Sequence, residues 1–298
     1  MKRAFIILNP AAGRGRGYGL ERPLAETARR LGWEVVVRFT RRAGEETDLA
    51  VEARAAGWPI VVAAGGDGTV HGVVNGLLAD GPTSTTLAHV PVGNGNDYAR
   101  ALGLKAGSVR RNLVRVLGGV RRVFDVGRVG AEYFANGMGI GFDAEVVRHT
   151  LRMSHLSGFP MYLTGVYRAF GSFVAPDLEI EAVEHRERSR VMMFNVSLGP
   201  TQGGGFRIAP GAVPDDGLFH VCVIRTVGFL KFVRYVPRVV VGRHVGLPEV
   251  TLFTTREVRV TGVSGPLALQ LDGELRYPEQ ETVEVKLLPR YLHVLCGS

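Results

Sequence analysis

The chain has 298 residues, of which 46% are hydrophobic and 21% are charged, so it can bury a substantial core and is not a wholly disordered protein. Its length suits one large domain or two ordinary ones. The formal net charge of +8 lies entirely in residues 1–128, which hold 19 Lys and Arg against 11 Asp and Glu, whereas residues 129–298 hold 17 of each. The N-terminal part therefore suits a phosphate, a nucleic acid or an anionic membrane surface, although a compositional preference for arginine over lysine, 32 to 4, explains the excess equally well.

The first 90 residues alternate between strand-like and helix-like segments. The strand-like segments are Arg3–Leu8, Trp33–Phe39, Ile60–Ala64 and Leu87–Val90, and the helix-like segments are Leu20–Leu31, Glu45–Ala56 and Val70–Leu78. Because the strands are unbroken apolar runs, this alternation predicts a parallel sheet covered by helices on both faces. Function is then expected where the strands end and the helices begin.

After Asp125 the pattern changes to longer alternating segments, which are typical of antiparallel strands. These segments are Leu178–Val183, Arg190–Leu198, Phe219–Arg225, Val250–Val260 and Thr282–Leu287, with two predicted helices at about Asp143–Leu151 and Met161–Phe173. The pattern predicts a second, sandwich-like domain that begins near residue 128.

The cysteines and the apolar runs of the sequence indicate the cellular compartment in which the protein is expected. Cys222 and Cys296 each lie in an apolar alternating stretch, which predicts two buried free thiols in a reducing compartment. The apolar run Ala4–Leu8 is too short for a signal peptide, and no run approaches the length of about 18 apolar residues that a membrane span needs. We therefore expect a cytoplasmic protein.

The strongest motif is a glycine-rich turn, Gly65-Gly66-Asp67-Gly68-Thr69-Val70-His71, which follows the strand Ile60–Ala64 and opens a helix. Its glycines let the backbone approach a ligand closely, and the N–H groups of a helix N-terminus favour a phosphate. Asp67 fits such a site if a divalent cation or a hydrogen-bond network lies between it and the phosphate. A plain strand-to-helix turn is the alternative.

Two further loops follow neighbouring strands. They are Asn9-Pro10-Ala11-Ala12-Gly13-Arg14-Gly15-Arg16-Gly17 and Val92-Gly93-Asn94-Gly95-Asn96-Asp97. Three such loops at one sheet edge predict a nucleotide-sized site, but none contains Gly-Lys-Ser/Thr, so it is not a P-loop. The segment Gly139–Ala144 matches the pattern G-x-G-x-x-A, yet it lies in the antiparallel half, which argues against a dinucleotide-binding dehydrogenase.

Two acidic turns lie in the second half. Asp215-Asp216-Gly217 is either a hairpin turn or a site for a hard cation formed by Asp216 and nearby carbonyl groups. Asp272-Gly273-Glu274 reads as a tight hairpin turn. If it faced bound phosphates, Asp272 and Glu274 could deprotonate an attacking hydroxyl.

Taken in order, six motifs resemble the diacylglycerol kinase catalytic family, and more narrowly its soluble bacterial lipid kinases, relatives of sphingosine and ceramide kinases. The motifs are Asn9-Pro10…Gly13, Gly65–Thr69, Gly93-x-x-Asn96-Asp97, Gly141-Phe142-Asp143-Ala144, Asp215-Asp216-Gly217 and Asp272-Gly273-Glu274. The resemblance covers nearly the whole chain. It implies an α/β nucleotide-binding domain like that of NAD kinase and phosphofructokinase, in residues 1–127 with a returning segment 289–298, and an antiparallel β-sandwich lipid-binding domain in residues 128–288.

The resemblance also implies an enzyme that uses ATP and Mg²⁺ to phosphorylate a lipid hydroxyl, with diacylglycerol or a related lipid as acceptor. Its nucleotide contacts fall on Asn9, Pro10, Ala11, Ala12, Gly13, Thr40, Gly65, Gly66, Asp67, Gly68, Thr69, Val70, His71 and Asn94. Its structural Mg²⁺ falls on Asp216 and on the main-chain carbonyls of Val213 and Leu218. Its catalytic carboxylate falls on Glu274, supported by Asp272, and its acidic network on Asp67, Asp97 and Asp125.

Two positions depart from the family pattern. Asn94 stands where the family usually has Thr, and Gly72 stands where it commonly has Glu. The first departure concerns a nucleotide contact, and the second removes an acidic group near the nucleotide.

Other functions remain open. A kinase of a soluble hydroxyl compound, similar to NAD kinase, would not explain the apolar, aromatic stretch Leu156–Phe173, and a non-catalytic lipid or nucleotide sensor needs no base such as Glu274. Nucleic acid is not expected as a partner, because the arginines lack interleaved aromatic residues. We expect peripheral, transient membrane contact that gives access to the lipid substrate, and a homodimer is left open.

Overall fold

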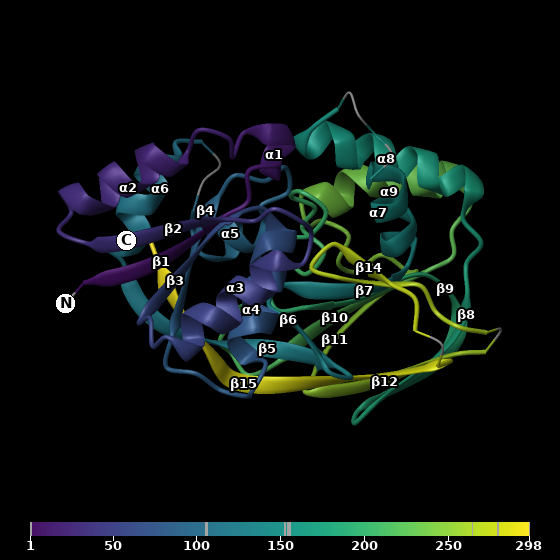
Figure 1. Ribbon diagram of the computed structural model, residues 1–298. Helices are drawn as coiled ribbons and strands as arrows, with labels where there is room; N and C mark the ends of the chain where they lie inside the picture. The colour runs from purple at the N-terminus through teal and green to yellow at the C-terminus, as the bar shows by residue number, and fades with distance from the viewer. Residues whose placement is uncertain are drawn as a thin grey trace. The chain divides into compact units, whose positions relative to one another are not determined.

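The chain forms two units in a computed structural model: unit 1, Met1–Asp125 with Arg290–Ser298, and unit 2, Val126–Pro289. The structure describes residues 2–104, 107–151, 153, 156–263, 265–278 and 280–297. Two strands, β5 (Val120–Val129) and β15 (Thr282–Cys296), each contribute residues to both units. Figure 1 labels most of the helices and strands of both units.

Unit 1 is a parallel sheet in the order β15-β4-β3-β1-β2. Its strands are β1 (Arg3–Leu8), β2 (Glu34–Phe39), β3 (Ile60–Gly65), β4 (Thr86–Pro91) and the end of β15, where Val294 pairs with Leu87. Strand β4 is buried along its whole length, as expected of a central strand covered on both faces.

The helices of unit 1 pack as two pairs, α2 with α6 and α3 with α4. Their bounds are α1 (Ala12–Gly15), α2 (Glu21–Arg30), α3 (Glu45–Ala55), α4 (Asp67–Leu78), α5 (Asp97–Ala101) and α6 (Val109–Leu117). The predicted helix Val70–Leu78 begins three residues earlier, so Asp67 lies in its first turn. Helix α6 is not among the helices predicted from the sequence pattern.

Unit 2 is built from antiparallel strands, and the predicted combination of an α/β domain with a β-sandwich is confirmed. Its strands are β6 (Glu132–Phe134), β7 (Gly137–Gly141), β8 (Asp177–Ala182), β9 (His185–Ser197), β10 (Phe219–Arg225), β11 (Val250–Thr255), β12 (Glu257–Gly262), β13 (Leu269–Leu271) and β14 (Glu274–Arg276). The long strand β9 pairs with β8 through its first half and with β7 and β10 through its second half. One continuous strand therefore belongs to two sheets.

Strand β10 separates two apolar cores because its successive side chains point to opposite faces. Phe219 and Val221 enter the core between the sheets, where the Phe219 ring stacks on Phe134 at 5.8 Å. Cys222 and Ile224 enter a second core, beneath α7 (Phe142–Leu151), α8 (Gly158–Ser172) and α9 (Phe229–Val240). Figure 1 shows these three helices gathered together on one side of unit 2.

Two expectations about this unit and one about the two cysteines are corrected. The predicted strand Val250–Val260 is two strands, β11 and β12, which pair with different neighbours. Helix α9 is not among the two helices expected, because Pro237 and its β-branched residues disfavour a helix in the sequence pattern. Cys222 is buried, and burial raises the pKa of its thiol to about 12, but Cys296 is only half-buried.

No helix among the described parts of the chain is long and apolar enough to cross a membrane.

A buried polar network runs through unit 2 beside the second core. Asn195 donates from Nδ2 to Asp143 Oδ2 at 2.9 Å and to Gln202 Oε1 at 2.8 Å. Gln202 Nε2 donates to Ser197 Oγ at 2.9 Å, and Gln270 Nε2 donates to Gln202 Oε1 at 3.2 Å. The amides satisfy one another, which a buried polar group requires if it is not to destabilise the fold.

Asp143 is half-buried as a residue, but the removal of its carboxyl from solvent in this network raises the pKa of that carboxyl to about 7, although the hydrogen bond from Asn195 opposes the shift. The unfolded chain releases the same proton near pH 4. The contribution of Asp143 to the free energy of unfolding is therefore full below about pH 4 and is lost as pH rises through about 7.

Replacing Asp143 by Asn should remove this pH dependence, since the amide is neutral throughout. The parent should lose stability between about pH 5 and about pH 8, whereas Asp143→Asn should not. The free energy of unfolding of the variant minus that of the parent should therefore increase by a few kcal/mol at most over this range. Urea unfolding of both proteins at both pH values measures the difference. If the difference in unfolding free energy between the variant and the parent did not change with pH, Asp143 would not have a raised pKa in the folded protein.

Candidate nucleotide site and carboxylate turn

Three loops of unit 1 meet at the carboxyl edge of the parallel sheet. They follow β1, β3 and β4, whose ends are aligned by the register, because Leu8 pairs with Ala64 and Gly65 pairs with Pro91. The predicted nucleotide residues after these strands therefore lie together, as ligand-binding residues do at this edge of α/β sheets.

Asn9 joins the first loop to the start of α4. Its Nδ2 donates to Thr69 Oγ1 at 3.1 Å, and its main-chain N–H donates to the carbonyl of Ala64 at 3.0 Å. Its Oδ1 accepts the N–H of Ala11 at 3.0 Å, which shapes the Asn-Pro turn. Asn9 thus holds two of the loops in one arrangement.

Glycines allow the loops to touch through their backbones. A Cβ atom on Gly93 would lie 2.4 Å from Gly66 Cα, and one on Gly13, where φ is +59°, would lie 2.2 Å from the Val92 carbonyl oxygen. The N–H groups of Val92 and Gly93 both donate to the Gly65 carbonyl, at 2.8 and 3.3 Å. These glycines are needed for the contact between the loops, besides any contact with a ligand.

Arg16 braces the first loop against the third. Its Nη2 donates to the Gly93 carbonyl at 2.8 Å and to Asn94 Oδ1 at 3.2 Å, and its Nε donates to the Gly13 carbonyl at 3.0 Å. Asn94, which replaces the Thr usual in the family, thus has a partner of its own in this chain. No local sequence pattern predicts this role of Arg16, because Gly93 and Asn94 lie 77 and 78 residues away along the chain.

A buried histidine lies beneath the glycine-rich turn. Burial lowers the pKa of His89 to about 4, so the ring is neutral, and its Nε2 lies 3.2 Å from the Gly65 carbonyl. Because a carbonyl only accepts, Nε2 is the protonated nitrogen. His89 is a missed residue of the site, and its place in the apolar strand β4 is the only signal that the sequence offers.

The three aspartates of the predicted acidic network have different partners. Asp67 Oδ1 accepts the N–H of Tyr98 at 3.1 Å, which ties the first turn of α4 to the residue after Asp97. Asp97 is buried and pairs with Arg100 at 2.8 Å. Hydrogen bonding therefore brings Asp67 to the start of α5.

Asp125 instead accepts the N–H of Arg290 at 2.7 Å, at a residue whose φ is +50°. The contact stabilises the point where the chain returns to unit 1. Thr40, another predicted contact, is buried after β2, where its N–H donates to the Leu8 carbonyl at 3.0 Å.

Gly72 has an acidic neighbour although it is not acidic itself. A Cβ atom on Gly72 would lie 2.2 Å from Cγ of Glu46, so the Glu46 side chain occupies the space above the glycine. Thr47, also on α3, donates to the Gly72 carbonyl at 3.0 Å. A carboxylate from α3 therefore lies beside Gly72, the position where the family commonly has Glu.

In unit 2, Asp272 holds the backbone of a neighbouring turn. Its Oδ2 accepts the N–H of Ala135, and its Oδ1 accepts the N–H groups of Asn136 and Gly137, each at 2.9 Å. Three such donors fix the position of the carboxylate. These hydrogen bonds join the turn that contains Asp272 to the main chain of residues 135–137.

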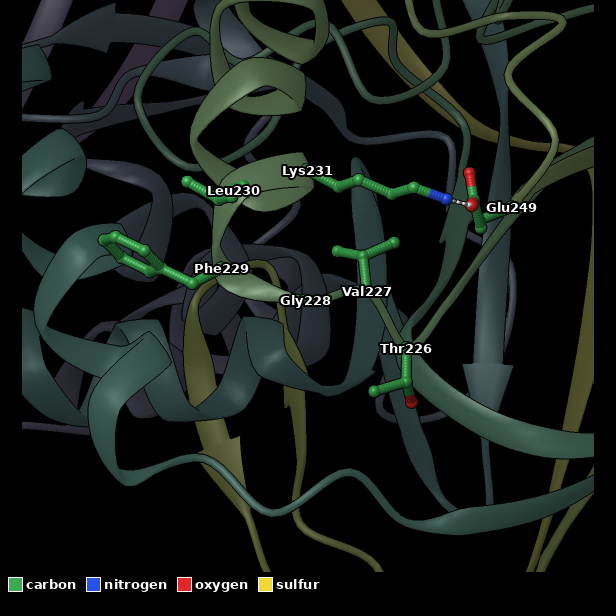
Figure 2. A pocket seen from close by; sticks show the side chains of 7 residues that line it. All are labelled: Thr226, Val227, Gly228, Phe229, Leu230, Lys231 and Glu249. Atoms are coloured by element: carbon green, nitrogen blue, oxygen red, sulfur yellow. Dashed lines mark hydrogen bonds and ion pairs between the residues drawn. The ribbon is translucent and has the colours of Figure 1, made fainter.

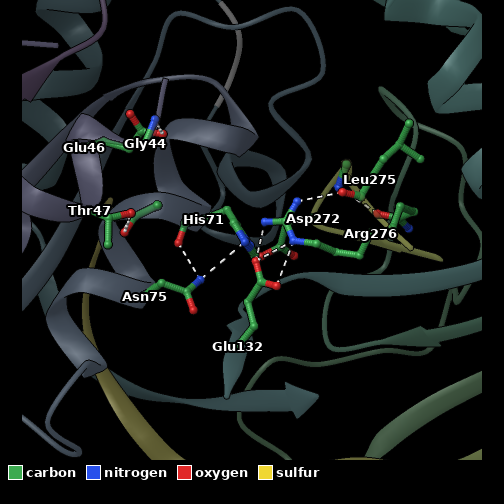
Figure 3. Close-up of polar contacts among 12 residues, drawn as sticks. Gly44, Glu46, Thr47, His71, Asn75, Glu132, Asp272, Leu275 and Arg276 are labelled. Atoms are coloured by element: carbon green, nitrogen blue, oxygen red, sulfur yellow. Dashed lines mark hydrogen bonds and ion pairs between the residues drawn. The ribbon is translucent and has the colours of Figure 1, made fainter. Parts of the chain in front are cut away.

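Glu274 is exposed and begins β14, directly after a turn in which both Asp272 and Gly273 have positive φ. Its carboxylate makes no hydrogen bond with a described residue, whereas the nearby Arg276 is engaged by Glu132, which raises the pKa of its guanidinium (Figure 3). Glu274 is therefore the carboxylate of this turn that is exposed to solvent.

The predicted magnesium loop has oxygen donors of a suitable type. Asp216 Oδ1 accepts the N–H of Leu218 at 3.0 Å, and its Oδ2 lies 2.8 Å from His220 Nε2. No cluster of three or more His, Cys, Asp or Glu that could hold a metal occurs among the described residues. A cation at Asp216 would thus depend on main-chain carbonyls, such as those of Val213 and Leu218, which suit a hard ion.

The parallel sheet with its three joined loops, together with the antiparallel unit, defines a protein with an NAD kinase-like fold. Residues 3–129 match the diacylglycerol kinase catalytic domain, and residues 136–296 match the YegS C-terminal NAD kinase beta sandwich-like domain. A diacylglycerol kinase of Bacillus subtilis (strain 168) is 33% identical over 301 residues, which cover 99% of this chain and 96% of that protein.

Two solved structures share the fold. A diacylglycerol kinase from Bacillus anthracis str. Sterne is 18% identical with a TM-score of 0.73, covering 99% of this chain and 97% of that one. An NAD kinase from Archaeoglobus fulgidus in complex with ATP is 14% identical with a TM-score of 0.56, and the match covers 99% of this chain and 94% of that one. The chain belongs to the diacylglycerol kinase catalytic family and is a lipid kinase, so the predicted family and enzyme class are confirmed.

The contact between the second and third loops can be tested by adding one methyl group. Gly93→Ala should lower the free energy of unfolding by about 1–3 kcal/mol, because its Cβ would meet backbone that cannot move aside easily. Gly211→Ala, at a glycine with open space around it, is the matched control and should change stability by less than about 0.5 kcal/mol. Equal stability of the two variants in denaturant unfolding would refute the close approach.

Proposed function

We propose that this lipid kinase transfers the γ-phosphate of ATP, with Mg²⁺, to the hydroxyl of diacylglycerol or a related lipid. The joined loops of unit 1 carry the proposal. They converge on the first turn of α4, whose N-cap residue Gly66 has no side chain with which to cap the free N–H groups. Such N–H groups and the helix dipole bind phosphate oxygens.

In this proposal the nucleotide contacts are those predicted from the family, namely Asn9, Pro10, Ala11, Ala12, Gly13, Thr40, Gly65, Gly66, Asp67, Gly68, Thr69, Val70, His71 and Asn94. The main chain of the loops binds the phosphates. Arg16 and Asn9 keep the loops in register, so the phosphate-binding groups are already in place before ATP arrives.

Oxygen donors of both units fit Mg²⁺. Asp67, with Asp97 and Asp125, is proposed as the acidic network at the phosphates, and Asp216 with the carbonyls of Val213 and Leu218 as the structural site. When bound, the ion supplies charge neutralisation between phosphoryl oxygens.

Glu274 is the proposed general base. Its carboxylate accepts the proton of the lipid hydroxyl as that oxygen attacks the γ-phosphorus in line, and the bond to the β-phosphate oxygen breaks to release ADP. Asp272 holds the turn through three N–H groups and so orients Glu274. Because the acceptor lies in a bilayer, the protein contacts the membrane peripherally.

Removing the base should affect transfer far more than binding. Glu274→Gln should lower kcat by roughly 10²- to 10⁴-fold, while ATP affinity changes little. The measurement is transfer of label from γ-labelled ATP to extracted lipids, with ATP binding followed by calorimetry. Glu281→Gln, at another exposed glutamate of unit 2, is the control and should keep parental activity.

Full activity of Glu274→Gln would remove this residue from the mechanism. Label recovered only in a water-soluble product would favour a kinase of a soluble hydroxyl compound, the activity that the NAD kinase-like fold also permits.

A further inference from the structure

Two neighbouring helices of unit 2 expose apolar side chains next to basic ones. We call this surface the α8–α9 face and define it by Tyr167, Arg168, Phe229, Leu230, Val233 and Arg234, all of which are exposed. The side chain of Leu230 is 85% exposed and that of Phe229 is 58% exposed. Apolar residues this open to water at the start of a helix need an explanation beyond packing.

The opposite side of α9 fixes the helix rigidly to the protein. Phe232 and Val236 are buried in the second core, and the Phe232 ring stacks on Phe170 of α8 at 4.2 Å. Phe170 also contacts Phe229, with ring centroids 5.6 Å apart. The exposed side chains are therefore presented by an ordered aromatic cluster.

The charges of the two helices have one sign. Helices α8 and α9 together contain no Asp or Glu, and they carry Arg168, Lys231, Arg234 and Arg238. The nearby Glu249 is engaged by Lys231 Nζ at 2.6 Å and by the Tyr235 hydroxyl. The arginines of the α8–α9 face thus meet no competing carboxylate on their own helices.

A pocket of about 380 Å³ lies at the start of α9, lined by Thr226, Val227, Gly228, Phe229, Leu230, Lys231 and Glu249. Figure 2 shows Phe229 and Leu230 pointing away from the Lys231–Glu249 pair. The apolar and the charged sides of this turn are therefore separated, as in helices that lie in a membrane interface.

We propose that the α8–α9 face docks on an anionic lipid bilayer, with Phe229 and Leu230 inserted among the acyl chains and Arg168 and Arg234 at the headgroups. This docking surface rests on the proposed lipid kinase function. It adds to that function the surface by which the protein reaches the bilayer. Apolar insertion and attraction to anionic lipid together give reversible binding.

The test is flotation of the full chain with vesicles of phosphatidylcholine containing about 30% phosphatidylglycerol, without any acceptor lipid or ATP. The parent protein should bind these vesicles, and much less of it should float with vesicles of pure phosphatidylcholine. Leu230→Ser and the double variant Phe229→Ser/Leu230→Ser should weaken binding, the double by about tenfold or more. Arg168→Gln/Arg234→Gln should weaken binding to the anionic vesicles by a similar factor.

Val183→Ser is the matched control, because Val183 is 90% exposed on the turn between β8 and β9, and it should bind as the parent does. A parent that does not float, or Leu230 and Phe229 variants that float equally well, would overturn the proposal. Loss of kinase activity toward every acceptor would count against the proposed function alone, since flotation measures no transfer.

A second inference rests on the buried amide network. Gln270, which is buried, accepts the N–H of Gly273 at 2.7 Å and donates to Gln202 at 3.2 Å. The bond to Gly273 lies within the turn that presents Glu274. We propose that Gln270 is a positioning residue for Glu274, and this inference rests on the proposed catalytic role of that carboxylate.

Two variants distinguish positioning from general structural support. Gln270→Leu removes the acceptor and should lower kcat about 10- to 100-fold with little change in the KM for ATP. In Gln270→Glu, a protonated carboxyl offers the same acceptor and donor, but an ionised one does not. The ratio of its kcat to that of the parent should therefore rise as pH falls from about 8 to about 6.

Parental kcat in Gln270→Leu, or a ratio for Gln270→Glu that is flat across this range, would overturn the positioning role. If Glu274→Gln were itself fully active, the proposed base would fail instead, so the two failures are distinct.

Discussion

The contact between the backbones of Gly66 and Gly93 constrains the whole candidate nucleotide site. A Cβ atom on Gly93 would lie 2.4 Å from Gly66 Cα and would push apart the loops that follow β3 and β4, and one on Gly66 would make a tight contact of 3.1 Å with Gly93 Cα. With the loops in contact, the Gly65 carbonyl accepts two N–H groups from the third loop and lies beside the neutral ring of His89. The glycines of this motif therefore serve the fold first, because they allow the backbones of the two loops to approach closely.

In unit 2, both faces of the sheet that contains β10 are covered by apolar cores. Since β10 sends alternate side chains to opposite faces, the same strand supports the core between the sheets and the core beneath the helices. The aromatic cluster around Phe232 completes the second core. Because the inner side of α9 is held there, its outer side is free to carry Leu230 and Arg234, and a rigid support suits insertion into a lipid surface.

The acidic residues show how far residue type can predict a role. Asp272 and Glu274 look equivalent in the sequence, but the first accepts three main-chain N–H groups and the second is exposed. Asp67 and Asp125 likewise differ in partner, since one contacts the start of α5 and the other the returning chain at Arg290. These partners lie far away along the chain, so no local pattern could distinguish the four carboxylates.

Local patterns were sufficient for the parallel α/β unit, the antiparallel unit and the three glycine-rich loops, because apolar periodicity and glycine placement act over a few residues. They failed for α9, where Pro237 and β-branched residues weaken the helical signal, and for the change of sheet at Arg256. Only the tertiary structure decided that Arg16 braces two loops and that Gln270 holds the Gly273 turn. Such contacts depend on which distant segments the packed strands bring together, and that information is absent from any short stretch of sequence.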